Sequence, residues 1–173
     1  MILTIKPFGT VDPTILSDLK RELGSFGTVV LAPRAPVPES FVRRKRSGFV
    51  QIQASDFERE LAGEPGDRVL AVTDVDLFDR GLNFVFGHAT IHDRFAVISI
   101  ARFGDDGRDK LVERATKTAI HELGHTFGLY HDDANPDCVM HFSEEIEDTD
   151  RKGRAFCRKC APAAAFTLSR LGT

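Results

Sequence analysis

The chain has 173 residues, of which 42% are hydrophobic and 28% are charged, and its formal net charge is −3. This length and composition suit one globular domain with a hydrophobic core, and they exclude a disordered chain. The negative charge argues against nucleic acid as the main partner, because domains that bind nucleic acid are usually basic.

The N-terminal segments alternate between strand and helix patterns. Residues 1–8 form an apolar, β-branched run that is typical of a strand, and residues 28–33 form a second one. Between them, Asp12 followed by a proline is typical of a helix start, and this helix is expected to close at Gly24 or Gly27.

A proline-rich, charged stretch follows the second strand. The basic run within it, residues 43–48, is interpreted as a solvated loop, with docking of an acidic partner as the alternative. Downstream, the patterns predict an extended segment at residues 48–54 and a short helix at 55–63, opened by Ser55 or Asp56. Three strands are predicted at 68–73, 81–90 and 94–103, and a long helix at 106–129. Strands that alternate with helices indicate a parallel sheet covered by helices.

The character of the sequence changes after Gly128. Short loops surround an acidic stretch at residues 144–150, and a helix is predicted over residues 151–160. The sequence has no apolar run of the about 18 residues that a membrane-spanning helix needs. Its N-terminus lacks the segments of a secretory signal, so we expect a cytoplasmic protein with no membrane partner.

The long helix carries the motif with the clearest chemical meaning. His121 and His125 are four residues apart and therefore lie on one helix face, with Glu122 one residue further round. Gly128 allows the chain to turn, so that His131 reaches the same point. Three protein ligands leave a tetrahedral zinc ion one position for water. The alternative is a histidine-rich helix end without a metal.

This pattern predicts a zinc-dependent peptidase. Zinc lowers the pKa of its bound water to about 7, and Glu122 is expected to accept the proton of that water and later donate it to the leaving amine. One alternative is a zinc-stabilised binding or regulatory module, which the intact Glu122 disfavours. Another is a nucleic-acid-binding zinc module, which the net charge disfavours.

The three cysteines, Cys138, Cys157 and Cys160, all lie in the last third of the chain. A disulfide framework is not expected in a chain without a secretory signal, so a metal site is the more natural interpretation. A redox role for the C-x-x-C pair is the alternative, although no thioredoxin-like strand precedes it.

The segment "HELGHTFGLYH" resembles the metzincin pattern H-E-x-x-H-x-x-G-x-x-H. Met140 resembles the methionine that metzincins place in a turn beneath the zinc, where it packs without binding the metal. "CVM" and "CRKC" resemble the added cysteine set of the archaemetzincins, or archaelysins. The resemblance covers about residues 1–160.

This resemblance implies an α/β, metzincin-like zincin fold with a small, twisted, mostly parallel sheet, an active-site helix and a short zinc-stapled C-terminal subdomain. Residues 1–173 would form one metalloprotease domain, with an upper subdomain at 1–128 and a lower one at 129–173. The implied substrate is a peptide or small protein, and we expect a monomer. The implied cofactors are two zinc ions, the catalytic one bound by His121, His125 and His131.

The second, structural zinc would be bound by Cys138, Cys157 and Cys160. The sequence departs from the family at its fourth ligand, because Asp132 follows the third histidine where the family has cysteine. Zinc accepts a carboxylate oxygen, so Asp132 is the leading candidate. The alternatives are Asp133, His141 or water as the ligand, or loss of the second site.

Three further side chains have chemistry that could bear on this site. His88 and His92 are expected at the rim or surface, with His88 in the substrate cleft as the alternative. Tyr130 precedes His131, but the sequence does not fix the direction of its side chain.

Overall fold

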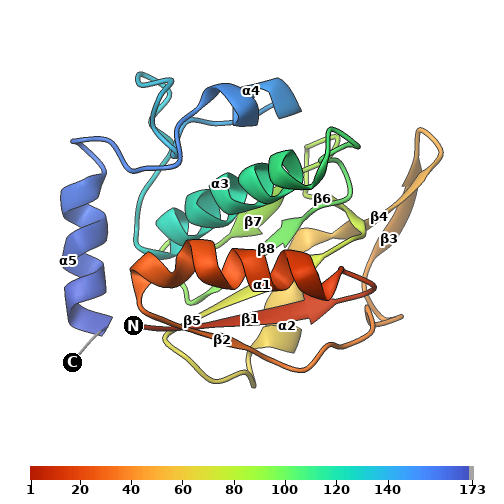
Figure 1. Ribbon diagram of the computed structural model, residues 1–173. Coiled ribbons are helices and arrows are strands. Elements are labelled where there is room, and N and C mark those ends of the chain that lie inside the picture. Colours follow the sequence, from red (N-terminus) through yellow and green to blue (C-terminus); the bar gives the residue numbers. More distant parts are fainter. Residues whose placement is uncertain (172–173) are drawn as a thin grey trace.

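The computed structural model describes residues 1–171, and Figure 1 shows its fold. A five-stranded sheet, with strand order β2-β1-β5-β8-β7, forms its centre. Four strands run parallel: β1 (Ile2–Phe8), β2 (Thr28–Leu31), β5 (Arg68–Thr73) and β8 (Phe95–Ser99). The short β7 (Gly87–Ala89) runs antiparallel to β8 at one edge. The expected strand over residues 81–90 is thus reduced to three residues, because the preceding segment is a loop that borders a cleft.

Helices cover both faces of this sheet (Figure 1). The helices α1 (Pro13–Glu22) and α3 (Arg108–Thr126) pack on one face, and α2 (Phe57–Leu61) packs on the other. The central strand β5 is buried along its whole length, since alternate side chains point into one core or the other. The prediction of a mostly parallel, helix-covered sheet is confirmed.

The helix starts follow the predicted chemistry at α1 and depart from it at α2. The Asp12 carboxylate accepts a hydrogen bond from the Thr14 backbone N–H at 2.8 Å, and a 3₁₀ turn after α1 ends at Gly27. At α2, Asp56 is the N-cap residue, as one of the two predicted starts, but its side chain makes no capping hydrogen bond because a 3₁₀ turn over Ala54–Asp56 leads directly into the helix. The Asp56 carboxylate instead accepts from the Val42 N–H at 2.6 Å.

A second sheet, with strand order β3-β4-β6, contains the basic run. Its strands are β3 (Arg43–Arg46), β4 (Phe49–Gln53) and β6 (Asp76–Phe78). The loop expected at residues 43–48 is therefore a hairpin, which extends from the body of the molecule (Figure 1). Arg44 explains the difference, because it donates to Gln51 Oε1 at 2.7 Å and its guanidinium lies 3.9 Å from the centre of the Phe78 ring. These contacts offset the low strand propensity of basic residues.

The C-terminal part also differs from the sequence-based expectation. The helix predicted over residues 151–160 is wrong, because most of this segment is a turn that carries two cysteines. The helices flank it as α4 (Ile146–Arg151), which a Glu145–Asp148 capping box opens, and α5 (Ala161–Leu171). The predicted lower subdomain ends at 173, and residues 172–173 lie outside the described part.

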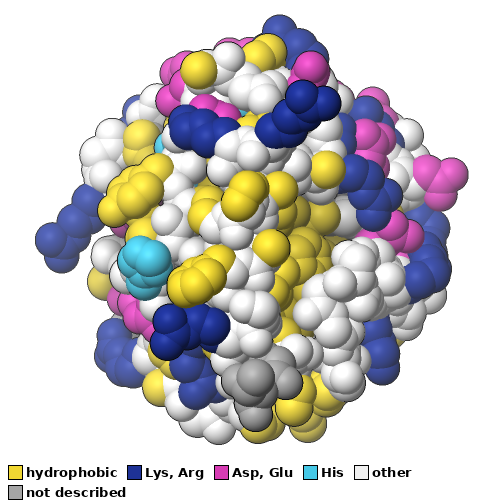
Figure 2. Space-filling view, turned by 90° about the vertical axis from the view of Figure 1, so that its left-hand side faces the viewer, with side chains coloured by type: hydrophobic (Ala, Val, Ile, Leu, Met, Phe, Trp, Pro, Cys, Tyr) yellow, Lys and Arg dark blue, Asp and Glu magenta, His cyan; other side chains and the backbone are white. Residues whose placement is uncertain are grey.

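The helix α5 stands apart from the sheet and is attached near the end of α3, where Thr167 Oγ1 donates to the Phe127 carbonyl oxygen at 3.0 Å. On the side of the molecule where α5 lies, hydrophobic side chains gather toward the middle of the face, and basic and acidic side chains lie around them (Figure 2). Within residues 1–171, no helix combines the length and the apolar character needed to cross a membrane.

Candidate functional site

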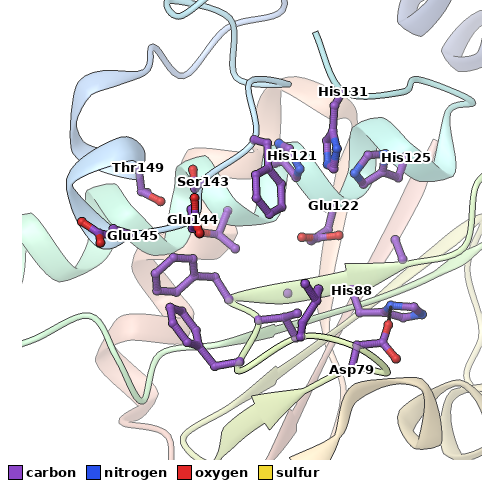
Figure 3. A pocket seen from close by; sticks show the side chains of 18 of the residues that line it. Asp79, His88, His121, Glu122, His125, His131, Ser143, Glu144, Glu145 and Thr149 are labelled. Carbon is purple, nitrogen blue, oxygen red and sulfur yellow. Dashed lines mark ion pairs between the residues drawn. The ribbon is translucent and has the colours of Figure 1, made fainter. Parts of the chain in front are cut away.

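Three histidines converge at the C-terminal end of α3. His121 and His125 come from the helix, and His131 comes from the segment after it (Figure 3). Their ring centroids are 4.8 to 5.2 Å apart, and one ligand nitrogen from each lies within 4.8 Å of the other two. The three predicted ligands are therefore brought together in an arrangement that one metal ion can bridge.

Backbone carbonyls orient the two helical imidazoles. His121 Nδ1 lies 2.8 Å from the Val139 carbonyl oxygen, and His125 Nδ1 lies 2.7 Å from the Leu129 carbonyl oxygen. When each Nδ1–H donates to its carbonyl, Nε2 is left as the ligand atom. Burial lowers the pKa of His121 well below its usual value and that of His125 to about 4, so both rings are neutral, as metal binding requires.

The turn that returns His131 depends on Gly128. This residue has a φ of +92°, and a Cβ there would lie 2.1 Å from Cε1 of His92. The His125 carbonyl oxygen accepts hydrogen bonds from the N–H groups of both Gly128, at 2.9 Å, and His92, at 3.1 Å. Glycine is therefore required both for its backbone conformation and for the close approach of His92, which is exposed as expected.

A buried arginine that sequence reasoning missed supports the same helix end. The Arg68 guanidinium donates to the Thr126 carbonyl oxygen and to Thr126 Oγ1, both at 3.0 Å. A cation at this position satisfies a free carbonyl of the last helical turn. The only signal in the sequence was a charged residue at the start of a strongly apolar strand.

Glu122 lies beside the histidines and points from α3 toward β7 (Figure 3). Its side chain is buried, and Gly87 on β7 leaves room for it, since a Cβ there would lie 2.6 Å from Glu122 Oε1. Burial raises the pKa of Glu122 to about 8, although the Lys152 charge opposes this shift. A carboxyl group with a pKa near neutrality is suited to accept and return a proton.

Met140 packs beneath the helix that carries the histidines. It is fully buried, and its carbonyl oxygen accepts a hydrogen bond from the Asp132 N–H at 3.1 Å. A Cβ at Gly124 would lie only 2.4 Å from the Met140 sulfur, so the absence of a side chain there allows the methionine to approach. The methionine thus packs against the helix that carries His121 and His125.

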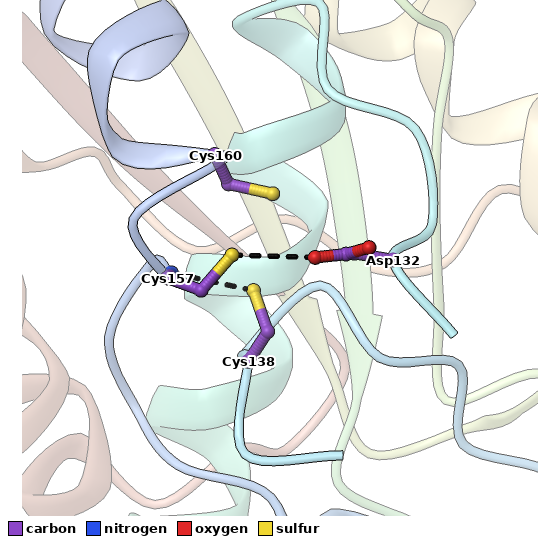
Figure 4. A group of neighbouring side chains, drawn as sticks. All are labelled: Asp132, Cys138, Cys157 and Cys160. Atoms are coloured by element: carbon purple, nitrogen blue, oxygen red, sulfur yellow. Dashed lines mark hydrogen bonds between the residues drawn. The ribbon is translucent and has the colours of Figure 1, made fainter. Parts of the chain in front are cut away.

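The three cysteines form a second cluster with Asp132 (Figure 4). One ligand atom from each of the four lies within 4.8 Å of the others. Asp132 Oδ2 is 3.2 Å from Cys157 Sγ, and the Cys157 N–H donates to Cys138 Sγ at 3.4 Å. Among the described residues, neither Asp133 nor His141 belongs to this group.

Comparison with known proteins decides the family. The sequence model of Peptidase family M54 matches residues 29–164. The chain belongs to peptidase family M54. It is 44% identical to the archaemetzincin of Methanopyrus kandleri over 140 residues, which cover 80% of this chain and 78% of that protein. It is 38% identical to the archaemetzincin of Methanocaldococcus jannaschii over 167 residues, which cover 92% and 90%.

Solved structures agree with this M54 membership. The crystal structure of the Methanopyrus kandleri archaemetzincin superposes with a TM-score of 0.86 at 37% identity, covering 98% of this chain and 96% of that one. That of the Archaeoglobus fulgidus archaemetzincin, complexed with malonate, superposes with a TM-score of 0.83 at 32% identity, covering 94% and 99%. The expected zincin fold and archaemetzincin resemblance are confirmed, and this M54 peptidase is a zinc metallopeptidase.

A cleft of about 700 Å³ opens at the histidines of this M54 peptidase. One wall consists of β7 and the loop before it, and the other consists of residues 142–145, with Thr149 and Lys152 also in the lining. His88 lines the cleft and its Nδ1 lies 2.9 Å from Asp79 Oδ2, which agrees with the alternative considered for it. Tyr130 is 70% exposed and is not part of the lining.

Lys152 is the cleft residue that sequence reasoning missed most completely. Its side chain is only 3% exposed, and its Nζ donates to the His141 carbonyl oxygen at 2.9 Å. Burial lowers its pKa to about 8. The burial of Lys152 could not be predicted from the sequence, because a lysine between an acidic stretch and a cysteine pair is typical of a solvated surface.

Proposed function

We propose that Glu122 is the general base and acid of the peptidase and that His121, His125 and His131 bind the catalytic zinc ion. The observation that carries this proposal is the convergence of the three imidazoles beside a buried carboxyl group in an open cleft. A bound zinc ion supplies a water of lowered pKa and polarises the substrate carbonyl.

The side chains of the site have separate tasks in peptide hydrolysis. A carboxylate oxygen of Glu122 accepts a proton from the attacking water and returns it to the leaving amine. The carbonyl oxygens of Val139 and Leu129 fix the ring orientations of His121 and His125 before substrate arrives. The burial of Glu122 limits the water that competes for its carboxylate.

We further propose a second, structural zinc ion bound by Asp132, Cys138, Cys157 and Cys160. Three sulfur atoms and one carboxylate oxygen form a donor set that zinc accepts. Asp132 Oδ2 faces the cysteines, while its Oδ1 accepts from Lys159 Nζ at 2.8 Å, so Oδ2 is the ligand oxygen of this proposal. The site would tie the cysteine turn to the residue next to His131.

The division into an upper part, residues 1–128, and a lower part, residues 129–173, is also a proposal. It is supported by the turn at Gly128, since the helical ligands precede this turn and His131 and all of the cysteines follow it. One chain supplies every group of both metal clusters, which supports a monomer as the working unit. The net charge of −3 supports peptides and small proteins, and not nucleic acid, as the partners.

Glu122→Gln tests the catalytic assignment. We expect the variant to keep the zinc content of the natural protein, about two ions per chain by mass spectrometry of the metal. Its cleavage of a fluorogenic peptide library is expected to fall about 10²–10⁴-fold, because a general base contributes that much. The control is Glu147→Gln, the same change at an exposed position on α4, which should cleave normally.

Two outcomes would contradict the proposal. Cleavage that survives in Glu122→Gln would remove Glu122 from the reaction. Zinc in the natural protein without cleavage of any library peptide would favour a zinc-stabilised binding module on the same fold. Asp132→Ala tests the second site separately, and a zinc content unchanged by this variant would remove Asp132 from it.

A further inference from the structure

Lys152 places a buried cation in the cleft wall. It follows α4 directly and lines the cleft together with Thr149 and with Thr118, which lies one turn before Glu122 on α3. Its Nζ is 3.3 Å from Nδ1 of His121. The ammonium group is therefore separated from the metal-facing side of His121 by a single imidazole ring.

The hydrogen-bond donors of this ammonium group are only partly used. An ammonium group has three N–H donors, and one of them is satisfied by the His141 carbonyl oxygen at 2.9 Å. His121 Nδ1 is not an acceptor when it donates its own hydrogen to Val139 and binds metal through Nε2. In that tautomer, the His141 carbonyl oxygen is the one acceptor that the described residues offer to the Lys152 ammonium group. A buried, unpaired charge of this kind is costly unless a ligand completes its contacts.

A second buried lysine shows how such a group is satisfied when its role is structural. Lys117, on the same helix as the histidines, is 5% exposed. Its Nζ contacts the Thr149 carbonyl oxygen at 3.2 Å, the Asp150 carbonyl oxygen at 3.0 Å and Glu113 Oε1 at 2.7 Å. Lys117 therefore has a carboxylate and a full set of acceptors, whereas Lys152 contacts one carbonyl oxygen and the His121 ring, has no carboxylate partner among the described residues and lines the cleft.

The acidic groups of the cleft do not neutralise Lys152. Asp79 pairs with His88, and the Glu145 carboxylate accepts from the Asp148 N–H as part of the α4 capping box. Glu144 is exposed at the rim. Glu122 attracts Lys152 at longer range but makes no ion pair with it within 4 Å among residues 1–171. No other lysine or arginine belongs to the described lining of the cleft.

We propose that Lys152 forms a subsite for a carboxylate of the substrate, next to the scissile bond. Phe84 and Phe86 supply apolar lining along the same cleft, against which the aliphatic part of a substrate residue can pack. The carboxylate belongs either to an aspartate or glutamate side chain or to the C-terminus of a short peptide. This inference rests on the proposed function, because it assigns the substrate class of the same cleft.

Matched peptides test the subsite. Fluorogenic peptides carrying glutamate or its neutral isostere glutamine beside the cut would be compared, each as a C-terminal acid and as an amide. We expect the natural protein to cleave one carboxylate form with a kcat/KM at least about tenfold higher than that of its neutral counterpart. In Lys152→Met this ratio is expected to fall to about one. In Arg151→Met, which removes an exposed cation from the neighbouring position, the ratio should not change.

The outcomes separate the two carboxylate sources and the two proposals. A glutamate preference identifies a side-chain subsite, and a preference for the free acid identifies a terminal one. Equal cleavage of all four peptides, or a ratio that persists in Lys152→Met, would overturn the inference. Should Lys152→Met not fold, the ratios of the natural protein alone decide.

A binding measurement keeps this inference independent of catalysis. The zinc-loaded Glu122→Gln protein would be titrated with the same peptides, labelled for fluorescence anisotropy. The carboxylate form should bind about tenfold more tightly than its neutral counterpart. If no peptide is cleaved by the natural protein, the proposed function fails, whereas the anisotropy ratio still tests Lys152. A binding ratio of one would refute the subsite.

Discussion

Gly124→Ala is expected to destabilise the protein, although Gly124 lies within a helix. In an exposed helix, this change gains about 1 kcal/mol. Here the new methyl group would lie 2.4 Å from the Met140 sulfur and 3.0 Å from Cε1 of Phe156. Met140 is fully buried, so moving its thioether aside would disturb the packing of its neighbours. Overpacking of this kind costs about 1–3 kcal/mol, which leaves a net loss of up to about 2 kcal/mol.

A double-mutant cycle isolates this contact. Urea unfolding, followed by circular dichroism, would be measured for Gly124→Ala, Met140→Ala and the double variant. Without the thioether, the alanine at 124 should be neutral or stabilising, so we expect a coupling free energy of about 1–3 kcal/mol. The control is Gly24→Ala, where a Cβ meets no atom within 4 Å. This variant should be neutral or gain up to about 1 kcal/mol.

The reasoning is refuted if Gly124→Ala changes the free energy of unfolding equally in both backgrounds. Its cost would then arise from the helix itself and not from the methionine beneath it. A loss in Gly24→Ala as large as that in Gly124→Ala would point to a general intolerance of alanine and would also remove the argument.

Three further predictions concern the turn, the cysteine cluster and the ion pair between α3 and α4. Gly128→Ala should lose at least about 1–2 kcal/mol in urea unfolding, because its φ of +92° is unfavourable for alanine and the methyl group would meet His92. The kcat/KM of this variant should also fall. A normal free energy of unfolding together with a normal kcat/KM would show that the turn tolerates a side chain. Asp132→Cys would complete a set of four thiolates, so the second zinc should be retained at higher chelator concentrations than in the natural protein; equal retention would contradict a ligand role for Asp132. Hydrogen bonds from Arg114 lower the pKa of Asp150 in the folded protein. These bonds therefore stabilise the fold fully above the unfolded pKa of about 3.9, and this stabilisation is lost as the pH falls through the lower folded pKa. Asp150→Asn should therefore be less stable at neutral pH and show a flatter acid limb in urea midpoints measured against pH, and parallel curves would contradict this linkage.

The convergence of the three histidines beside Glu122 was predictable because most of its geometry is local. His121, Glu122 and His125 lie within two turns of one helix, and the position of Gly128 specifies where the chain must turn toward His131. The sheet was predictable for a similar reason, since β1, β5 and β8 are short, mostly apolar segments of the kind that is buried on both faces of a parallel sheet.

The segments that were mispredicted depend on distant partners. Residues 151–160 have a composition compatible with a helix, but Cys157 and Cys160 turn toward Cys138, which is remote in the sequence. The basic strand β3 exists because β4 pairs with it and because Phe78 receives the Arg44 guanidinium. Lys152 looked like a surface residue because nothing near it in the sequence indicates that α4 lies over the cleft.

The exposed position of Tyr130 has a practical consequence for every measurement on this peptidase. The chain has no tryptophan and a single tyrosine. This residue lies between the glycine turn and His131, and 70% of it is exposed. All tyrosine emission from the protein therefore originates in the loop that delivers the third histidine. We expect zinc binding at His131 to change this emission, which would give an optical assay without a label. The protein absorbs only weakly at 280 nm, because it has one tyrosine and no tryptophan.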